Sequence, residues 1–155
     1  MISPELLRRY PFFAYMENSH LKEISMISEE VNIPKGTLIF EEGKTVSALY
    51  LLMSGEVDLY FFVGEEKDLK NRKEFLADDI NVGEAFGISA LVDPFTYTAS
   101  ARATKDSRVI KIDAPKLRRL TETDPSLGCK LMGQIAKALA ERLRFTRIQL
   151  VAARS

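Results

Sequence analysis

The sequence predicts an α+β fold, in which an antiparallel β-roll, or jelly roll, is flanked by N-terminal helices and a long C-terminal helix. Apolar residues recur at helical spacing over residues 1–29, with period two over 30–113, and at helical spacing again over 114–155. Six of the eight glycines fall in the middle stretch, from Gly36 to Gly87. Tight corners between short strands favour residues without a Cβ, so this distribution indicates a roll. We expect the 155 residues to form one domain of these three parts.

The composition is that of an ordinary globular chain and argues against several classes of function. Lys and Arg (22) balance Asp and Glu (22), whereas nucleic-acid-binding proteins usually carry a basic excess. One Cys and one His are too few for a Cys/His metal site or His-based catalysis, and the lone Cys is typical of a reducing cytoplasm. No apolar stretch is long enough for a membrane span. We expect a cytoplasmic protein that is not an enzyme, with no metal, cofactor, nucleic-acid or membrane partner.

The N-terminal part reads as two short helices. Pro11 interrupts the first apolar cluster, because proline cannot continue a helix. Asn18 or Ser19 is expected to cap the second helix with its side-chain oxygen, and apolar residues then recur at helical spacing to Ile27. His20 lies in the predicted capping turn, so we expect it at the surface.

The middle part is predicted to contain seven short strands. They lie near Glu30–Ile33, Thr37–Phe40, Leu49–Met53, Val57–Phe62, Arg72–Leu76, Ala99–Ala103 and Arg108–Ile112. The run from Gly64 to Glu74 is almost wholly charged and indicates a solvated hairpin tip. Its Glu65–Glu66 pair has no nucleophile or histidine beside it, so it does not suggest acid–base catalysis.

The C-terminal part begins with two helix-start signals. Asp113 is expected to cap a helix through Glu122, and Asp124–Pro125 begins a last helix that runs to about Val151. One heptad seam on this helix comprises Cys129, Met132, Ala136, Leu139, Leu143, Thr146 and Leu150, and a second row comprises Leu127, Leu131, Ile135, Ala138 and Phe145. One row can pack on the roll while the other forms a homodimer; alternatively the helix only wraps its own domain. We expect the Cys129 thiol to be a small buried hydrophobe.

The order of helices, glycine-punctuated roll and long helix resembles the cyclic-nucleotide-binding domain family. The segment Ile33–Phe61 is similar to the opening strands of that family, with glycines at the corners. Gly83–Ala103 resembles its phosphate-binding cassette, and Leu117–Leu150 resembles the paired helices of bacterial regulators of the catabolite-activator type. The resemblance implies a non-catalytic regulatory or ligand-sensing module, with a nucleotide-like or other small-molecule effector and dimerisation through the last helix.

The cassette has a physical rationale of its own. A glycine followed by a short helix, here Gly87 and Ile88–Leu91, presents free backbone N–H groups that favour an anion. The resemblance implies a ligand site formed by Gly87, Ile88, Ser89, Ala90, Tyr97, Thr98 and Ala99. A cassette beginning at Gly83–Glu84 would insert four residues before Ala103, so we prefer the register at Gly87, with Glu84 serving the preceding turn.

The sequence departs from the family at both polar anchors of the cassette. In the family a Glu directly after the glycine binds the ribose hydroxyl, and an Arg ten positions after it pairs with the cyclic phosphate; here these residues are Ile88 and Tyr97. The lost hydrogen bond is worth about 1.5–3 kcal/mol, and an unpaired buried phosphate costs roughly 3–5 kcal/mol. A total near 5 kcal/mol is about three to four decades in affinity. Arg102 alternates to the opposite face of its strand and does not replace the missing Arg. We expect no tight binding of cAMP or cGMP.

Three hypotheses follow for the cassette. It is a sensor retuned for a less charged ligand, a dimerising or docking module whose pocket is filled by Ile88 and Tyr97, or a weak cyclic-nucleotide binder that uses backbone N–H groups with Ser89 and Thr98. The first two differ in whether the side chains of Ile88 and Tyr97 point inward. The resemblance also implies that ligand moves the last helix about a hinge near Thr123–Asp124.

Overall fold

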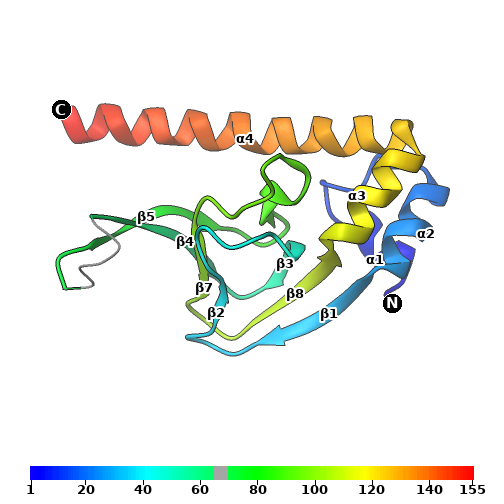
Figure 1. Ribbon diagram of the computed structural model, residues 1–155, viewed down its shortest axis with the longest axis horizontal. Helices are drawn as coiled ribbons and strands as arrows, with labels where there is room; N and C mark the ends of the chain where they lie inside the picture. Colours follow the sequence, from blue (N-terminus) through cyan, green and yellow to red (C-terminus); the bar gives the residue numbers. More distant parts are fainter. Residues whose placement is uncertain (65–69) are drawn as a thin grey trace.

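The computed structural model describes residues 1–64 and 70–155 and contains two four-stranded antiparallel sheets (Figure 1). Their strand orders are β1-β8-β3-β6 and β2-β7-β4-β5. The strands are β1 (Ser28–Ile33), β2 (Leu38–Phe40), β3 (Ala48–Ser54), β4 (Val57–Val63), β5 (Lys73–Ile80), β6 (Ala85–Phe86), β7 (Ser100–Ala103) and β8 (Ser107–Asp113). Residues 65–69 of the expected hairpin tip, including Glu65–Glu66, lie outside the described residues. The predicted α+β fold with an antiparallel roll is confirmed.

Helices flank the roll at both ends of the sequence. They are α1 (Pro4–Arg8), α2 (Asn18–Met26), the short 3-10 helix η1 (Ile88–Leu91), α3 (Ala114–Thr123) and α4 (Pro125–Arg154). In Figure 1, α1, α2 and α3 lie together at one end of the roll, and α4 extends from that end along the length of the molecule. The long last helix is therefore present, and it runs three residues beyond the predicted end at Val151.

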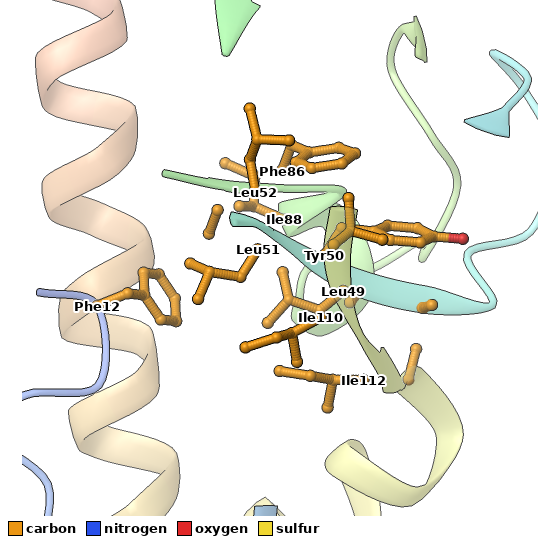
Figure 2. Close-up of a cluster of buried hydrophobic side chains, with 14 of the residues drawn as sticks. Phe12, Leu49, Tyr50, Leu51, Leu52, Phe86, Ile88, Ile110 and Ile112 are labelled. Atoms are coloured by element: carbon orange, nitrogen blue, oxygen red, sulfur yellow. The ribbon is translucent and has the colours of Figure 1, made fainter. Parts of the chain in front are cut away.

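The core lies between the two sheets and beneath α4. Leu49, Leu51 and Leu52 of β3 are fully buried, and β3 lies inside its sheet, paired with β8 on one edge and with β6 on the other. Figure 2 shows these side chains in one cluster with those of Ile110 and Ile112 from β8. Apolar residues buried on a central strand stabilise the fold by removing apolar surface from water.

The glycines of the roll occupy the corners that the sequence predicts. All six between residues 36 and 87 have positive φ, a conformation that residues with a Cβ rarely adopt. At Gly55 a Cβ would also lie 2.2 Å from the Ser107 hydroxyl oxygen. The turn between β3 and β4 thus requires glycine on two grounds.

The seven predicted strands are all present, but the second sheet extends further than expected. β5 continues to Ile80, four residues beyond the predicted end at Leu76, because Asp78 and Asp79 keep pairing with β4 across a bulge. The two-residue strand β6 was not predicted, and its strand conformation depends on pairing with Tyr50 and Leu51.

Two of the predicted helix caps are present and one is wrong. The Asp113 carboxylate accepts from the Lys116 N–H (2.9 Å), and the Asp124 carboxylate accepts from the Leu127 N–H (3.3 Å). At α2, Asn18 is already helical and its side-chain oxygen accepts from Arg8 instead of capping the helix. Glu17 takes the N-cap position without a side-chain hydrogen bond.

The two apolar rows of α4 face different environments. Leu127, Leu131 and Ile135 of one row are buried against the rest of the chain. All seven residues of the heptad seam are exposed, including Cys129, so the expectation of a buried thiol is wrong. Within residues 1–64 and 70–155, no helix has an apolar stretch sufficient to cross a membrane.

Candidate functional site

The turn that the sequence predicts for the cassette is present directly after Gly87. This residue has φ 72° and precedes η1, and a Cβ in its place would lie 3.1 Å from the Ala48 carbonyl oxygen. The Ala90 N–H already donates to the Gly87 carbonyl (3.1 Å), closing a single 3-10 turn. Because the turn has only four residues, few peptide dipoles are aligned in it. The helix end therefore attracts an anion less strongly than the sequence suggests.

Tyr97 points inward, beneath the cassette. Its side chain is 4% exposed, and its ring stacks on Phe40 with centroids 3.8 Å apart and planes 5° from parallel. Its hydroxyl donates to the Ala48 carbonyl (3.3 Å) and accepts from the Ser47 N–H (3.3 Å). The Tyr97 side chain thus packs through its ring and is hydrogen-bonded through its hydroxyl, as is typical of a core residue.

Ile88 also points inward. It is buried, and Figure 2 shows its side chain within the cluster formed by β3 and by Phe86 of β6. The inward orientation of both Ile88 and Tyr97 is the condition that distinguishes a filled pocket from an open one.

The other predicted site residues lie in different environments. Ala90 is buried, Ser89 and Ala99 are half-buried, and Thr98 is exposed. The hydroxyls of Ser89 and Thr98 take part in no hydrogen bond among the described residues. None of these four residues lines the groove beside Arg118 or the groove beside Arg142.

Two charged residues near the cassette behave as the sequence predicts. The Glu84 carboxylate accepts from the Asn81 N–H (2.9 Å) and so closes the turn before the cassette. Arg102 donates two hydrogen bonds to Glu74 (3.1 and 3.0 Å), and its guanidinium lies 4.3 Å from the ring centroid of Tyr60. Ala101 and Ala103 on either side of it are fully buried. The Arg102 charge is therefore directed away from the cassette.

Sequence reasoning missed Arg118 of α3, which holds the far end of the cassette. Its Nη1 donates to the Ala90 carbonyl (2.7 Å), and its guanidinium lies 4.5 Å from the ring centroid of Phe95. Phe95 has φ 59°, which is uncommon for an aromatic residue. Leu91, Phe95 and Arg118 also line a groove of about 390 Å³ between the cassette and the last two helices. A lone arginine on an amphipathic helix gives no local signal of such a contact.

Arg142 connects α4 to the roll. Its Nη2 donates to the Ala85 carbonyl (2.6 Å), and its Nε lies 3.2 Å from the Asp78 carboxylate. Burial raises the pKa of Asp78, and the neighbouring guanidinium opposes that rise. Burial likewise lowers the pKa of Arg142, against the effect of Asp78. Burial of the Arg142–Asp78 pair therefore costs desolvation free energy, and the attraction between the two charges offsets part of that cost.

His20 connects the N-terminal helices to the predicted hinge. Its Nε2 lies 2.9 Å from the Asp124 carboxylate, and the residue is buried, so the expectation of a surface histidine is wrong. The cause is the packing of α2 at the junction of α3 and α4, which residue order alone does not reveal. The backbone N–H of Leu127 holds the pKa of Asp124 below its ordinary value, and His20 adds to this effect.

Known proteins share both the sequence pattern and the fold. Residues 30–124 match the family described as the cyclic nucleotide-binding domain, which is more than half of the chain. The CRP-like cAMP-activated global transcriptional regulator of Mycobacterium tuberculosis is 27% identical over 142 residues, covering 92% of this chain and 59% of that protein. The chain thus spans about three fifths of that relative. A cAMP-dependent protein kinase regulatory subunit of Emericella nidulans is 30% identical over 114 residues, covering 74% of this chain and 26% of that subunit.

A solved structure agrees over nearly its whole length. The crystal structure of a candidate cyclic nucleotide-binding protein from Geobacter metallireducens GS-15 superposes with a TM-score of 0.80 at 40% sequence identity. The match covers 92% of this chain and 99% of that one. The family match over residues 30–124 and this agreement in fold show that the chain belongs to the cyclic nucleotide-binding domain family.

Proposed function

We propose that this chain is a non-catalytic regulatory module whose cassette is filled by its own side chains and which acts through homodimerisation and docking rather than through tight binding of cAMP or cGMP. The observation that carries this proposal is the buried position of Tyr97, stacked on Phe40 and hydrogen-bonded to Ala48. At the position where the resemblance implies an arginine for the cyclic phosphate, the protein has a buried neutral phenol.

Entry of a nucleotide would require the Tyr97 side chain to leave. That movement would expose a buried aromatic side chain, at a cost of about 1.5–3 kcal/mol. It would also break the stack on Phe40, which contributes about 0.5–1.5 kcal/mol more. These costs add to the loss of the two polar anchors. Tyr97 thus opposes cyclic-nucleotide binding in two ways: its side chain must be displaced, and it does not supply the positive charge of an arginine.

The other two hypotheses have less support. A retuned sensor needs space beneath the cassette, where Tyr97 and Ile88 are buried. A weak cyclic-nucleotide binder needs converging N–H groups and hydroxyls, but η1 is a single turn and Thr98 is exposed. Neither alternative explains why the Tyr97 hydroxyl is bound to the backbone of β3.

The exposed seam of α4 supports homodimerisation. Met132, Leu139, Leu143 and Leu150 repeat at heptad spacing on one side of the helix and are all exposed in the single chain. A continuous apolar stripe of this kind favours a second copy, because its burial removes apolar surface from water. Cys129 begins the seam, and its thiol would remain free in a reducing cytoplasm.

Calorimetric titration with cAMP and cGMP at millimolar concentration tests the proposal. We expect no saturable heat from the parent protein. The control is the Ile88→Glu/Tyr97→Arg variant, which removes the phenol and supplies both polar anchors; a gain of binding in this variant alone would locate the block at these two positions. Micromolar binding by the parent would show that the cassette is open and that the proposal is wrong.

A further inference from the structure

A second groove lies apart from the cassette, between α4 and the stretch that joins β5 to β6. Its volume is about 380 Å³, within the range of small-molecule sites. Phe12 of the N-terminal segment also lines it, and Figure 2 shows that ring directed toward the cluster that contains Leu51. The predicted ligand-site residues, Gly87–Ala90 and Tyr97–Ala99, do not line this groove, so whether it binds a ligand is a question separate from the proposed function.

The charges that line the groove are predominantly negative. Asp78, Asp79, Glu84 and Glu141 supply four carboxylates, whereas Lys137 and Arg142 supply two cations. The Arg142 guanidinium is already engaged by Asp78 and by the Ala85 carbonyl. The carboxylates of Asp79 and Glu141 pair with no other described residue. With Asp78 and Arg142 offsetting each other, the other three carboxylates outnumber the one ammonium of Lys137, so the lining keeps a net negative charge.

Apolar side chains lie on both walls of the groove. Phe145 of α4 and Val82 of the β5–β6 connection are each more than half exposed. Ala85 and Ala138 are small residues that leave room between these walls. A ligand placed here would cover the exposed side chains, and the face of the Phe145 ring would also attract a cation.

We propose that this groove binds a small organic amine, a molecule with one ammonium group on an apolar body about the size of one aromatic ring. The ammonium group would lie near Asp79 and Glu141, and the apolar body would contact Phe145 and Val82. An anionic ligand of the same shape would meet the excess of carboxylates and is excluded by repulsion.

Three probes with the same phenyl ring test this proposal by calorimetry on the full chain: phenethylamine, phenylalanine and 3-phenylpropionate. They share one apolar body and differ in charge. We expect saturable binding of phenethylamine, weaker binding of phenylalanine and none of 3-phenylpropionate. Glu141→Gln and Asp79→Asn should each raise the dissociation constant of phenethylamine about tenfold.

The matched control is Glu122→Gln, which makes the same charge change at an exposed position on α3, outside this groove. Its affinity for phenethylamine should equal that of the parent. Absence of saturable phenethylamine binding, equal binding of 3-phenylpropionate, or an equal loss in Glu122→Gln would each overturn the proposal. Titration with cAMP uses different residues, so failure of the amine site and failure of the proposed function are distinguishable.

Discussion

The rings of Phe40 and Tyr97 stack face to face, with centroids 3.8 Å apart. The stack joins β2 to the part of the cassette between η1 and β7, and the Tyr97 hydroxyl adds a hydrogen bond to β3. If Tyr97 serves as a core residue, its truncation must leave a cavity. We expect Tyr97→Ala to lower the free energy of unfolding by about 3–5 kcal/mol, measured by urea denaturation.

The matched variant Tyr97→Phe keeps the stack and removes only the hydroxyl. It should cost about 1 kcal/mol, the net value of a typical hydrogen bond. A loss below 1 kcal/mol in Tyr97→Ala would mean that the side chain contributes little to the core, and the proposal of a filled cassette would then be contradicted.

Arg118 should couple the cassette to α3. Removing its guanidinium in Arg118→Ala leaves the Ala90 carbonyl and the Phe95 ring without their partner. We expect faster amide hydrogen exchange in η1 and in residues 92–96, because these residues lose a tertiary contact. Arg119→Ala is the control, since Arg119 is an exposed neighbour of the same charge. Equal exchange in both variants would show that Arg118 does not hold the cassette.

Arg142 should hold the middle of α4 against the roll. Breaking a fully buried ion pair costs about 3–5 kcal/mol, but Arg142 and Asp78 are both partly exposed, so we expect Arg142→Ala to lose about 1–2 kcal/mol. Hydrogen exchange should increase in α4 beyond Ile135, where the buried apolar row ends. Arg144→Ala, at an exposed position two residues away, should change neither quantity. If both arginine variants behave alike, the contact with β5 does not restrain the helix.

Local patterns predicted most of the fold, because alternation, glycine corners and helix caps are encoded in neighbouring residues. Asp113 and Asp124 are such cases: each lies directly before a proline-containing helix start and accepts a backbone N–H there. β6 and the end of β5 were not predictable in this way. Two residues are too few to show a period, and Asp78 and Asp79 have low strand propensity; both segments depend on their pairing partners.

The turn after Gly87 was predictable from the sequence, whereas the orientation of the side chains around it was not. The resemblance predicts a cassette at Gly87 with altered anchors at Ile88 and Tyr97, whereas the side-chain rotamers of these residues depend on the surrounding strands. The contacts of His20 with Asp124 and of Arg142 with Ala85 join residues far apart in sequence. Only tertiary packing brings these groups together, so residue order carries no signal of them.

The lowered pKa of Asp124 predicts a pH-dependent contribution to stability. The Leu127 N–H and His20 favour the charged carboxylate in the folded state. As pH falls below the ordinary pKa of aspartate, the Asp124 carboxylate therefore binds fewer protons in the folded protein than in the unfolded chain. The stabilisation by the Asp124 charge is fully present above the ordinary pKa of aspartate. It is lost as pH falls through the lowered pKa of Asp124 in the folded state.

The variant Asp124→Asn has no carboxylate at this position, so comparing it with the parent protein tests the contribution of the Asp124 charge to stability. The difference in unfolding free energy between parent and variant should be constant near neutral pH and should shrink as pH falls below the ordinary aspartate range. Chemical denaturation at a series of pH values measures it. A difference that does not change with pH would mean that the carboxylate charge makes no contribution at this junction.

The seam of α4 predicts a homodimer that a charge should disrupt. Leu139 and Leu143 lie in the middle of the seam and are 47% and 51% exposed in the single chain. In sedimentation equilibrium we expect the parent to be a dimer. Leu139→Asp and Leu143→Asp should each raise the dimer dissociation constant by about a hundredfold or more, because an unpaired charge would be buried in the seam.

Ile148→Asp is the matched control for the seam. Ile148 is 53% exposed on the same helix but lies on a different side of it, so the substitution adds the same charge to a comparable surface. Far-UV circular dichroism should show equal helix content in all three variants, which separates loss of the interface from loss of α4. A monomeric parent would contradict the proposed dimer. Equal dissociation of Ile148→Asp would move the interface away from the heptad seam to the side of the helix that carries Ile148.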